Sequence, residues 1–127
     1  MRLLSRTVPL LMVAGLLGCR EVTAPDATPL EAGGDFTIGI TAGTTPTFSW
    51  AGAGASGVSV FPADLSGFVP AHWQIGSNGE IRSPVRYGSQ PTGSTVVVSP
   101  RVLEEGRPYR VQVSRRDGRS AYREFIP

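Results

Sequence analysis

The 127-residue sequence has one cysteine, one histidine and no lysine, and these shortages exclude several kinds of site. With Cys19 alone no internal disulfide can form, so a folded domain must rely on its apolar core. A serine triad is unsupported, because no Gly-x-Ser-x-Gly motif accompanies His72. A zinc site at His72 lacks acidic partners at a suitable spacing. We therefore expect His72 to be an exposed or edge residue, and we predict no catalytic residue, metal or cofactor.

Two stretches imitate functional motifs but are better explained as turns. Gly52–Gly57 has the spacing of a dinucleotide-binding fingerprint, which requires a helix after the glycines to hold the pyrophosphate. Val58-Ser59-Val60 follows instead and predicts a strand, so a flexible hairpin turn is favoured. The adjacent acids Glu104 and Glu105 are expected to point apart into water.

The chain has no excess charge once its first residues are set aside. Arg2 and Arg6 account for the formal charge of +2, because the twelve arginines less these two leave ten, against ten acidic residues. Nucleic acid binding therefore gains no support. Five arginines are nevertheless candidates for a basic binding surface that could contact anionic partners such as phosphate-bearing glycans. They are Arg110, Arg115, Arg116, Arg119 and Arg123. Protection of strand edges by charge is the favoured alternative explanation for these residues.

The N-terminal segment has the pattern of an export signal. Arg2 and Arg6 form a positive region, and an apolar run follows from Val8 to Gly18. That run is too short to span a bilayer, which takes about 20 residues. A buried core helix is the alternative, but Pro9 and the two glycines of the run disfavour it.

Leu16-Leu17-Gly18-Cys19, at the end of this run, resembles the lipobox of bacterial lipoproteins. The resemblance implies cleavage before Cys19, diacylglycerol on its sulfur and acylation of the new amine. An ordinary secretory signal that ends in a chance cysteine is the alternative. Arg20 stands where lipoproteins of the inner membrane usually carry Asp. The resemblance therefore favours a cell-envelope location, on the outer membrane if the organism has one.

The chain divides into three parts. Residues 1–18 are predicted to be the signal peptide, and residues 19–34 a flexible, lipid-anchored tether rich in Pro, Thr and Gly. Residues 35–127 are predicted to form one domain.

Alternation of apolar and polar residues predicts that this domain is all-β. Pairs of apolar residues two positions apart recur along it and indicate short strands with turns between them. They include Phe36/Ile38/Ile40, Phe48/Trp50, Val58/Val60, Trp73/Ile75, Val96/Val98 and Tyr109/Val111/Val113, followed by a last strand near 121–126. The run Val96–Val98 is apolar on both faces, which predicts a central strand. Seven strands at this spacing favour a single antiparallel β-sandwich.

Turn residues separate the predicted strands. Ser77-Asn78-Gly79 is predicted to be a turn, and Asp117-Gly118 is predicted to form a two-residue hairpin turn with positive φ at both positions.

The stretch from Leu103 to Val113, Leu-Glu-Glu-Gly-Arg-Pro-Tyr-Arg-Val-Gln-Val, resembles the approach to the sixth strand of fibronectin type III domains. The resemblance implies a tyrosine corner, in which the Tyr109 hydroxyl bonds to backbone just upstream. Trp50 stands where such domains carry a core tryptophan. The stretch 61–87 departs from the family pattern and leaves the order of the middle strands open.

The segment Phe61–Trp73 has too many apolar groups for a plain loop. We expect it to pack across the open end of the sandwich. An exposed binding site that includes Phe68 and Trp73 is the alternative.

These features predict a membrane-anchored lipoprotein with a non-catalytic module for binding or for envelope structure. Its expected partners are membrane lipid through Cys19 and an envelope protein or glycan. The alternatives are a small envelope enzyme, or a subunit accessory to one, and a purely structural spacer.

Overall fold

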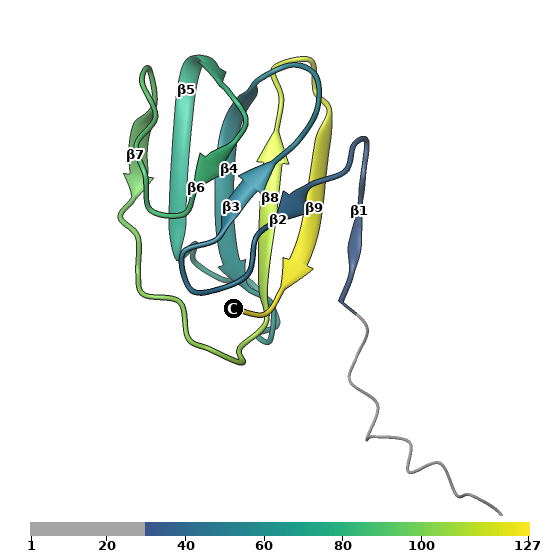
Figure 1. Ribbon diagram of the computed structural model, residues 1–127, viewed down its shortest axis with the longest axis vertical. Coiled ribbons are helices and arrows are strands. Elements are labelled where there is room, and N and C mark those ends of the chain that lie inside the picture. Colours follow the sequence, from purple (N-terminus) through teal and green to yellow (C-terminus); the bar gives the residue numbers. More distant parts are fainter. Residues whose placement is uncertain (1–29) are drawn as a thin grey trace, which may run out of the picture.

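The computed structural model describes residues 30–127, which form nine strands in two antiparallel sheets (Figure 1). The predicted signal peptide, Cys19 and most of the predicted tether lie outside the described residues. The strands are β1 (Ala32–Gly34), β2 (Gly39–Ile40), β3 (Thr47–Ser49), β4 (Ala55–Pro62), β5 (Trp73–Ile81), β6 (Val85–Arg86), β7 (Thr95–Val98), β8 (Tyr109–Ser114) and β9 (Ser120–Phe125). The prediction of an all-β, sandwich-like domain is confirmed.

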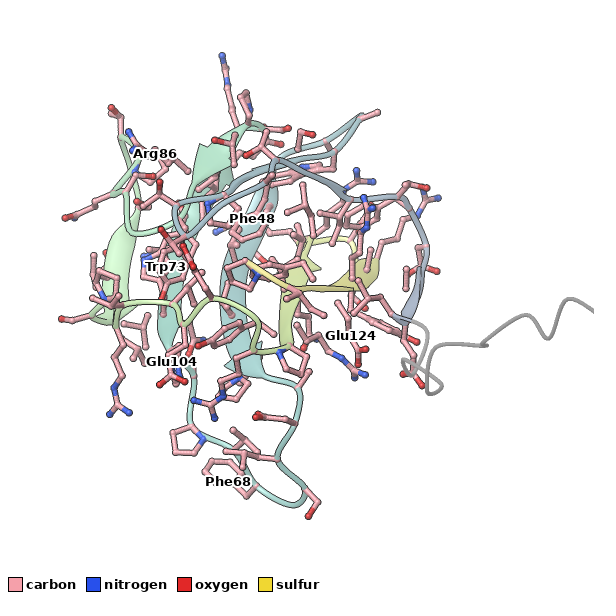
Figure 2. The ribbon with its side chains drawn as sticks, turned by 60° about the horizontal axis from the view of Figure 1, so that its bottom comes forward. Phe48, Phe68, Trp73, Arg86, Glu104 and Glu124 are labelled. Atoms are coloured by element: carbon pink, nitrogen blue, oxygen red, sulfur yellow. The ribbon has the colours of Figure 1, made fainter. Side chains whose placement is uncertain are left out.

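The larger sheet has six strands in the order β1-β9-β8-β4-β5-β7, and the smaller one has the order β2-β3-β6. The β4–β5 hairpin stays within the large sheet, the chain then crosses to β6 in the small sheet, and β7 returns to the outer edge of the large one. This path settles the order of the middle strands. The β4–β5 loop and the C-terminus lie at one end of the sandwich (Figures 1 and 2).

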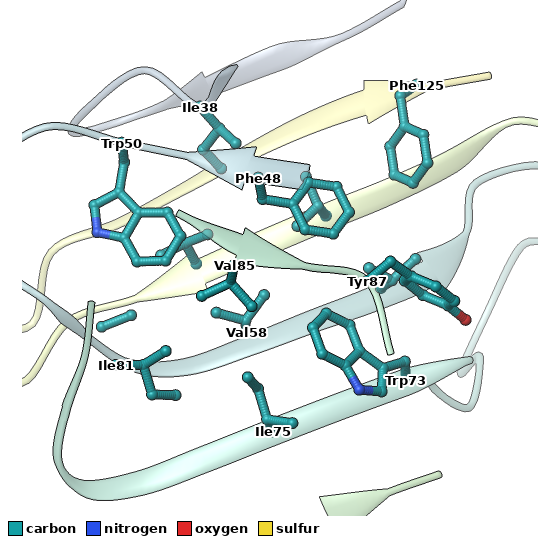
Figure 3. Packing of buried hydrophobic residues seen from close by; sticks show 14 of the residues in the cluster. Ile38, Phe48, Trp50, Val58, Trp73, Ile75, Ile81, Val85, Tyr87 and Phe125 are labelled. Atoms are coloured by element: carbon teal, nitrogen blue, oxygen red, sulfur yellow. The ribbon is translucent and has the colours of Figure 1, made fainter. Parts of the chain in front are cut away.

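The core lies between the two sheets and is built by the alternation seen in the sequence (Figure 3). Every second residue is buried in β8 and in β4 from Val58 onward, because successive side chains of a strand point to opposite faces. Phe48, from the small sheet, packs its ring edge-on to Phe125 at 5.6 Å and stacks on Trp73 at 6.4 Å. The aromatic rings thus join the two sheets.

The count of seven strands was too low for the described residues, which contain nine. β6 has only two residues, too few to show a period. β1 is Ala-Gly-Gly and carries no alternation, yet it pairs with β9 over three residues. It places the last residues of the predicted tether in the large sheet.

Gly34, at the end of β1, lets the chain pass from the large sheet to the small one. Its φ is +102°, and a Cβ at this position would overlap the carbonyl of Ser120 and the Cα of Ala121. Only glycine accommodates both the conformation and the close approach.

The prediction of a central strand at Val96–Val98 is wrong. β7 pairs with β5 alone and forms the outer edge of the large sheet. Val97 is 61% exposed, so the second apolar face of this strand meets solvent. A run of valines satisfies β propensity at an edge as well as at a centre.

Two predicted turns also differ. Ser77-Asn78-Gly79 lies within β5, where the register with β4 jumps and residues 77–80 bulge outward. The β8–β9 hairpin is confirmed at Asp117-Gly118, but only Gly118 has positive φ. Arg115 N–H donates to the Arg119 carbonyl, so the hairpin has a three-residue loop that ends in a left-handed glycine.

Candidate functional site

The β4–β5 loop (residues 63–72) is firmly held at both of its ends. Ala63 N–H donates to the carbonyl of Pro108 over 2.9 Å, and His72 N–H donates to that of Val60 over 2.7 Å. The His72 carbonyl accepts from Arg101 N–H at 3.0 Å. The base of the loop is therefore tied to β4 and to the connection that precedes β8.

An ion pair strengthens this base. Both carboxylate oxygens of Asp64 accept from Arg107 Nε, at 3.1 and 3.2 Å. The Arg107 guanidinium also lies 5.7 Å from the centre of the Tyr109 ring. The tyrosine is itself fixed, because its hydroxyl accepts a 3.0 Å hydrogen bond from Glu104 N–H. The upstream backbone contact predicted for Tyr109 is thus confirmed.

The tip of the loop projects away from the sandwich and carries apolar side chains (Figure 2). Phe68 is 98% exposed and Leu65 is 54% exposed. The prediction that the segment packs across the end of the domain is therefore wrong at the tip, although it is right for Ala71, which is buried. An aromatic side chain held in water on a well-anchored loop is a candidate binding surface.

Trp73, the other aromatic candidate of this segment, belongs to the core. Its side chain is fully buried, 5.1 Å from the ring of Tyr87 and edge-on to it. Its indole Nε1 has no hydrogen-bond partner within the described residues. Trp73 is therefore unable to contact a partner directly.

His72 stands at the base of the loop and is partly buried, with its ring 5.4 Å from that of Tyr109. Burial, and then the charges of Arg107 and Arg101, lower its pKa below the usual 6.5. It is therefore neutral at pH 7. In the described part of the chain the buried Nδ1 of His72 has no hydrogen-bond partner, and residues 30–127 contain no cluster of three or more potential metal ligands.

The candidate arginines do not form one surface. Arg110 lies near the loop end of β8, where it pairs with Glu124 at 2.9 Å and Glu31 at 3.1 Å. Its guanidinium covers the Tyr122 ring at 4.5 Å. Arg123 Nη1 donates to the carbonyl of Ile38 over 2.8 Å. Both side chains are thus engaged within the domain.

The other three candidate arginines belong to the β8–β9 hairpin at the opposite end of the sandwich (Figure 1). Arg115 is folded back: it donates to the Ala51 carbonyl, and its guanidinium lies 3.9 Å from the centre of the Phe36 ring. Arg116 and Arg119 are exposed, and Arg119 is 3.8 Å from Asp117. Of the three arginines of this hairpin, only Arg116 and Arg119 are thus exposed.

The Arg110–Glu124 pair predicts how the stability of the domain responds to acid. Burial of the Glu124 carboxyl raises its pKa. Hydrogen bonds from the Arg110 side chain and from Glu31 N–H, together with the positive charge of Arg110, lower the pKa by more, so that it lies below 4.5. The folded state therefore binds the proton less readily than the unfolded one. The contribution of Glu124 to stability is complete above pH 4.5 and is lost as the pH falls through the lowered pKa.

We expect Arg110→Gln to reduce the loss of stability on acidification when the free energy of unfolding is measured between about pH 6 and pH 3. Arg116→Gln, which removes an exposed arginine, is the matched control and should leave the pH dependence of stability unchanged. An equal loss of stability on acidification in both variants and the parent would contradict the assignment.

Three further exposed apolar residues were not predicted from the sequence. Val102 is 88% exposed, and Leu30 and Ile126 are about half exposed. Val102 precedes the buried Leu103, and Leu30 lies in a polar segment, so neither has a local pattern that marks it as a surface residue.

Comparison of the chain with protein-family models, with curated proteins and with solved structures finds no match. Between Leu30 and Pro127 no helix is long and apolar enough to cross a bilayer.

Proposed function

We propose that the protein is a lipoprotein of the bacterial cell envelope, anchored through acylated Cys19, whose β-sandwich is a non-catalytic module for binding or for envelope structure. The outer membrane is the favoured location because Arg20 follows the cysteine. The observation that carries the proposal is the exposed apolar tip at Phe68, on a loop whose ends are fixed by hydrogen bonds and an ion pair. Such a surface serves contact rather than chemistry.

We further propose that the sandwich is of the fibronectin type III kind. The Glu104–Tyr109 hydrogen bond supports this assignment, since it is the contact expected of a tyrosine corner. The buried Trp50, directly after β3, supports it as well.

Intact mass spectrometry of the mature protein from bacterial membranes tests the anchor. We expect a chain that begins at Cys19 and carries a diacylglyceryl group on sulfur and an acyl group on the amine. Two or three acyl chains hold a protein on a bilayer stably, whereas one holds it marginally. The protein should therefore sediment with membranes, and Cys19→Ala should abolish both the added mass and the sedimentation. A free thiol at Cys19 in the mature chain would refute the proposal.

A further inference from the structure

Exposed large apolar side chains gather at one end of the sandwich. Of the six such residues within 30–127, only Val97 lies elsewhere, on the edge strand β7. The other five are Leu30, Leu65, Phe68, Val102 and Ile126, and we call the surface they form the apolar end.

Contacts within the domain bring these five residues to the same end. Leu30 and Ile126 line one hollow together with Ala63, the first residue of the β4–β5 loop. Arg101 N–H donates to the carbonyl of His72, so the connection that carries Val102 passes the base of that loop. Phe68 projects furthest along this direction (Figure 2).

Paired charges border the apolar end. Arg107 and Arg110 each pair with two carboxylates, so acidic groups outnumber these two arginines. His72 is neutral at pH 7, as its lowered pKa implies. Nothing in this arrangement favours an anionic partner, so association of the apolar end must come mainly from burial of its apolar side chains.

The position of Leu30 relates the apolar end to the membrane. Leu30 is the first described residue and belongs to the apolar end itself, and ten residues, 20–29, lie between it and Cys19. A flexible chain of that length spans roughly 18 Å on average. The sandwich is longer than this, because the six regular residues of β8 alone extend about 20 Å and the β8–β9 hairpin lies beyond them. A lipid on Cys19 therefore keeps the apolar end nearer to the bilayer than the opposite end.

We propose that the apolar end rests on the bilayer that holds Cys19, with Phe68 and Leu65 inserted at the boundary between headgroups and acyl chains. This inference rests on the proposed lipid anchor. An aromatic and a leucine side chain on a projecting loop suit that boundary, where apolar faces are buried about 5–10 Å deep. The β8–β9 hairpin, at the other end, then points away from the membrane (Figure 1).

A fluorophore at position 68 tests the docking. In the lipidated protein the sulfur of Cys19 is a thioether, so Phe68→Cys introduces a unique thiol for an environment-sensitive dye. The full mature protein is reconstituted in phosphatidylcholine vesicles with or without nitroxide groups on the acyl chains. We expect a blue-shifted emission and a loss of most of the fluorescence in the nitroxide vesicles. Arg116→Cys, in the exposed hairpin at the opposite end, is the matched control and should lose little.

The apolar origin of the docking is tested with the same labelled protein. High salt should leave quenching at position 68 unchanged, because the docking does not depend on exposed charges. Leu65→Ser in the Phe68→Cys background should reduce the quenching, because it removes the neighbouring apolar contact.

The other outcomes overturn the docking. Equal weak quenching at both positions means that the apolar end is free in water or is covered by protein. Stronger quenching at position 116 means that the basic hairpin faces the lipid instead. The dyes on each Phe68→Cys chain are counted by intact mass before reconstitution. Two dyes per chain mean that Cys19 is a free thiol, which refutes the lipid anchor. The first two outcomes refute only the docking.

Discussion

Replacing Phe48 by alanine is expected to destabilise the domain by about 3–5 kcal/mol, the usual cost of truncating a buried phenylalanine. The side chain is fully buried and packs against Trp73 and Phe125, so its removal leaves a cavity between the two sheets. In a domain of this size each kcal/mol lowers the melting temperature by roughly 4–8 °C. The midpoint of thermal unfolding, followed by circular dichroism, should therefore fall by at least about 12 °C.

Phe68→Ala is the matched control, because the same atoms are removed from a side chain that is 98% exposed. Its effect on the free energy of unfolding should stay within about 0.5 kcal/mol. Similar losses of stability in the two variants would show that the tip of the β4–β5 loop is packed against the domain.

Truncation after Val113 is expected to abolish cooperative unfolding altogether. It removes β9, which pairs with β8 over six residues and with β1 over three. It also removes Phe125 from the core and leaves β8 as an unprotected edge. Because small domains are stable by only about 5–15 kcal/mol, loss of a whole strand leaves too little to maintain the fold. Circular dichroism should show no sigmoidal melting transition.

A shorter truncation after Phe125 keeps β9 and provides the control. It deletes Ile126 and Pro127 and loses the 3.2 Å hydrogen bond from Gly106 N–H to the Pro127 carbonyl. A cooperative transition should survive, with a modest decrease in midpoint. Cooperative melting of the chain that ends at Val113 would show that β9 is dispensable.

The strands best predicted from sequence are those with one buried face. In β4 and β8 the alternating valines and Tyr109 are buried as their spacing predicts. Alternation reports burial on one side of a sheet, and both strands lie inside the large sheet with that side on the core. The tyrosine contact was predicted as well, because the residues around Tyr109 have a recognisable local pattern.

Strands that depend on distant partners were missed or misplaced. β1 consists of alanine and glycines, and its pairing with β9 is decided by the crossing at Gly34. The valines of β7 give a strong strand signal, but its place at the sheet edge depends on the path of the whole chain. Local sequence indicates whether a segment forms a strand more reliably than it indicates which strand lies next to it in the sheet.

The candidate surface was predicted only in part. Phe68 and Trp73 lie five residues apart and are both large aromatic residues, yet one is exposed and the other is buried. Tertiary anchoring separates them, because β5 begins at Trp73 while the loop tip extends beyond the ties at Ala63 and His72. For the arginines, sequence reasoning proposed Arg110 as a contact for anionic partners but did not identify Glu31 and Glu124, the carboxylates that pair with it.

The pairing of β1 with β9 also has a mechanical consequence. Any tension that reaches the domain along the chain before Leu30 first loads β1, a strand of three residues antiparallel to β9. A pull along the strand axis strains these few pairs simultaneously, in shear, instead of peeling them apart one by one. Because the chain turns sharply at Gly34, β2 and the small sheet bear the load only after β1 has yielded.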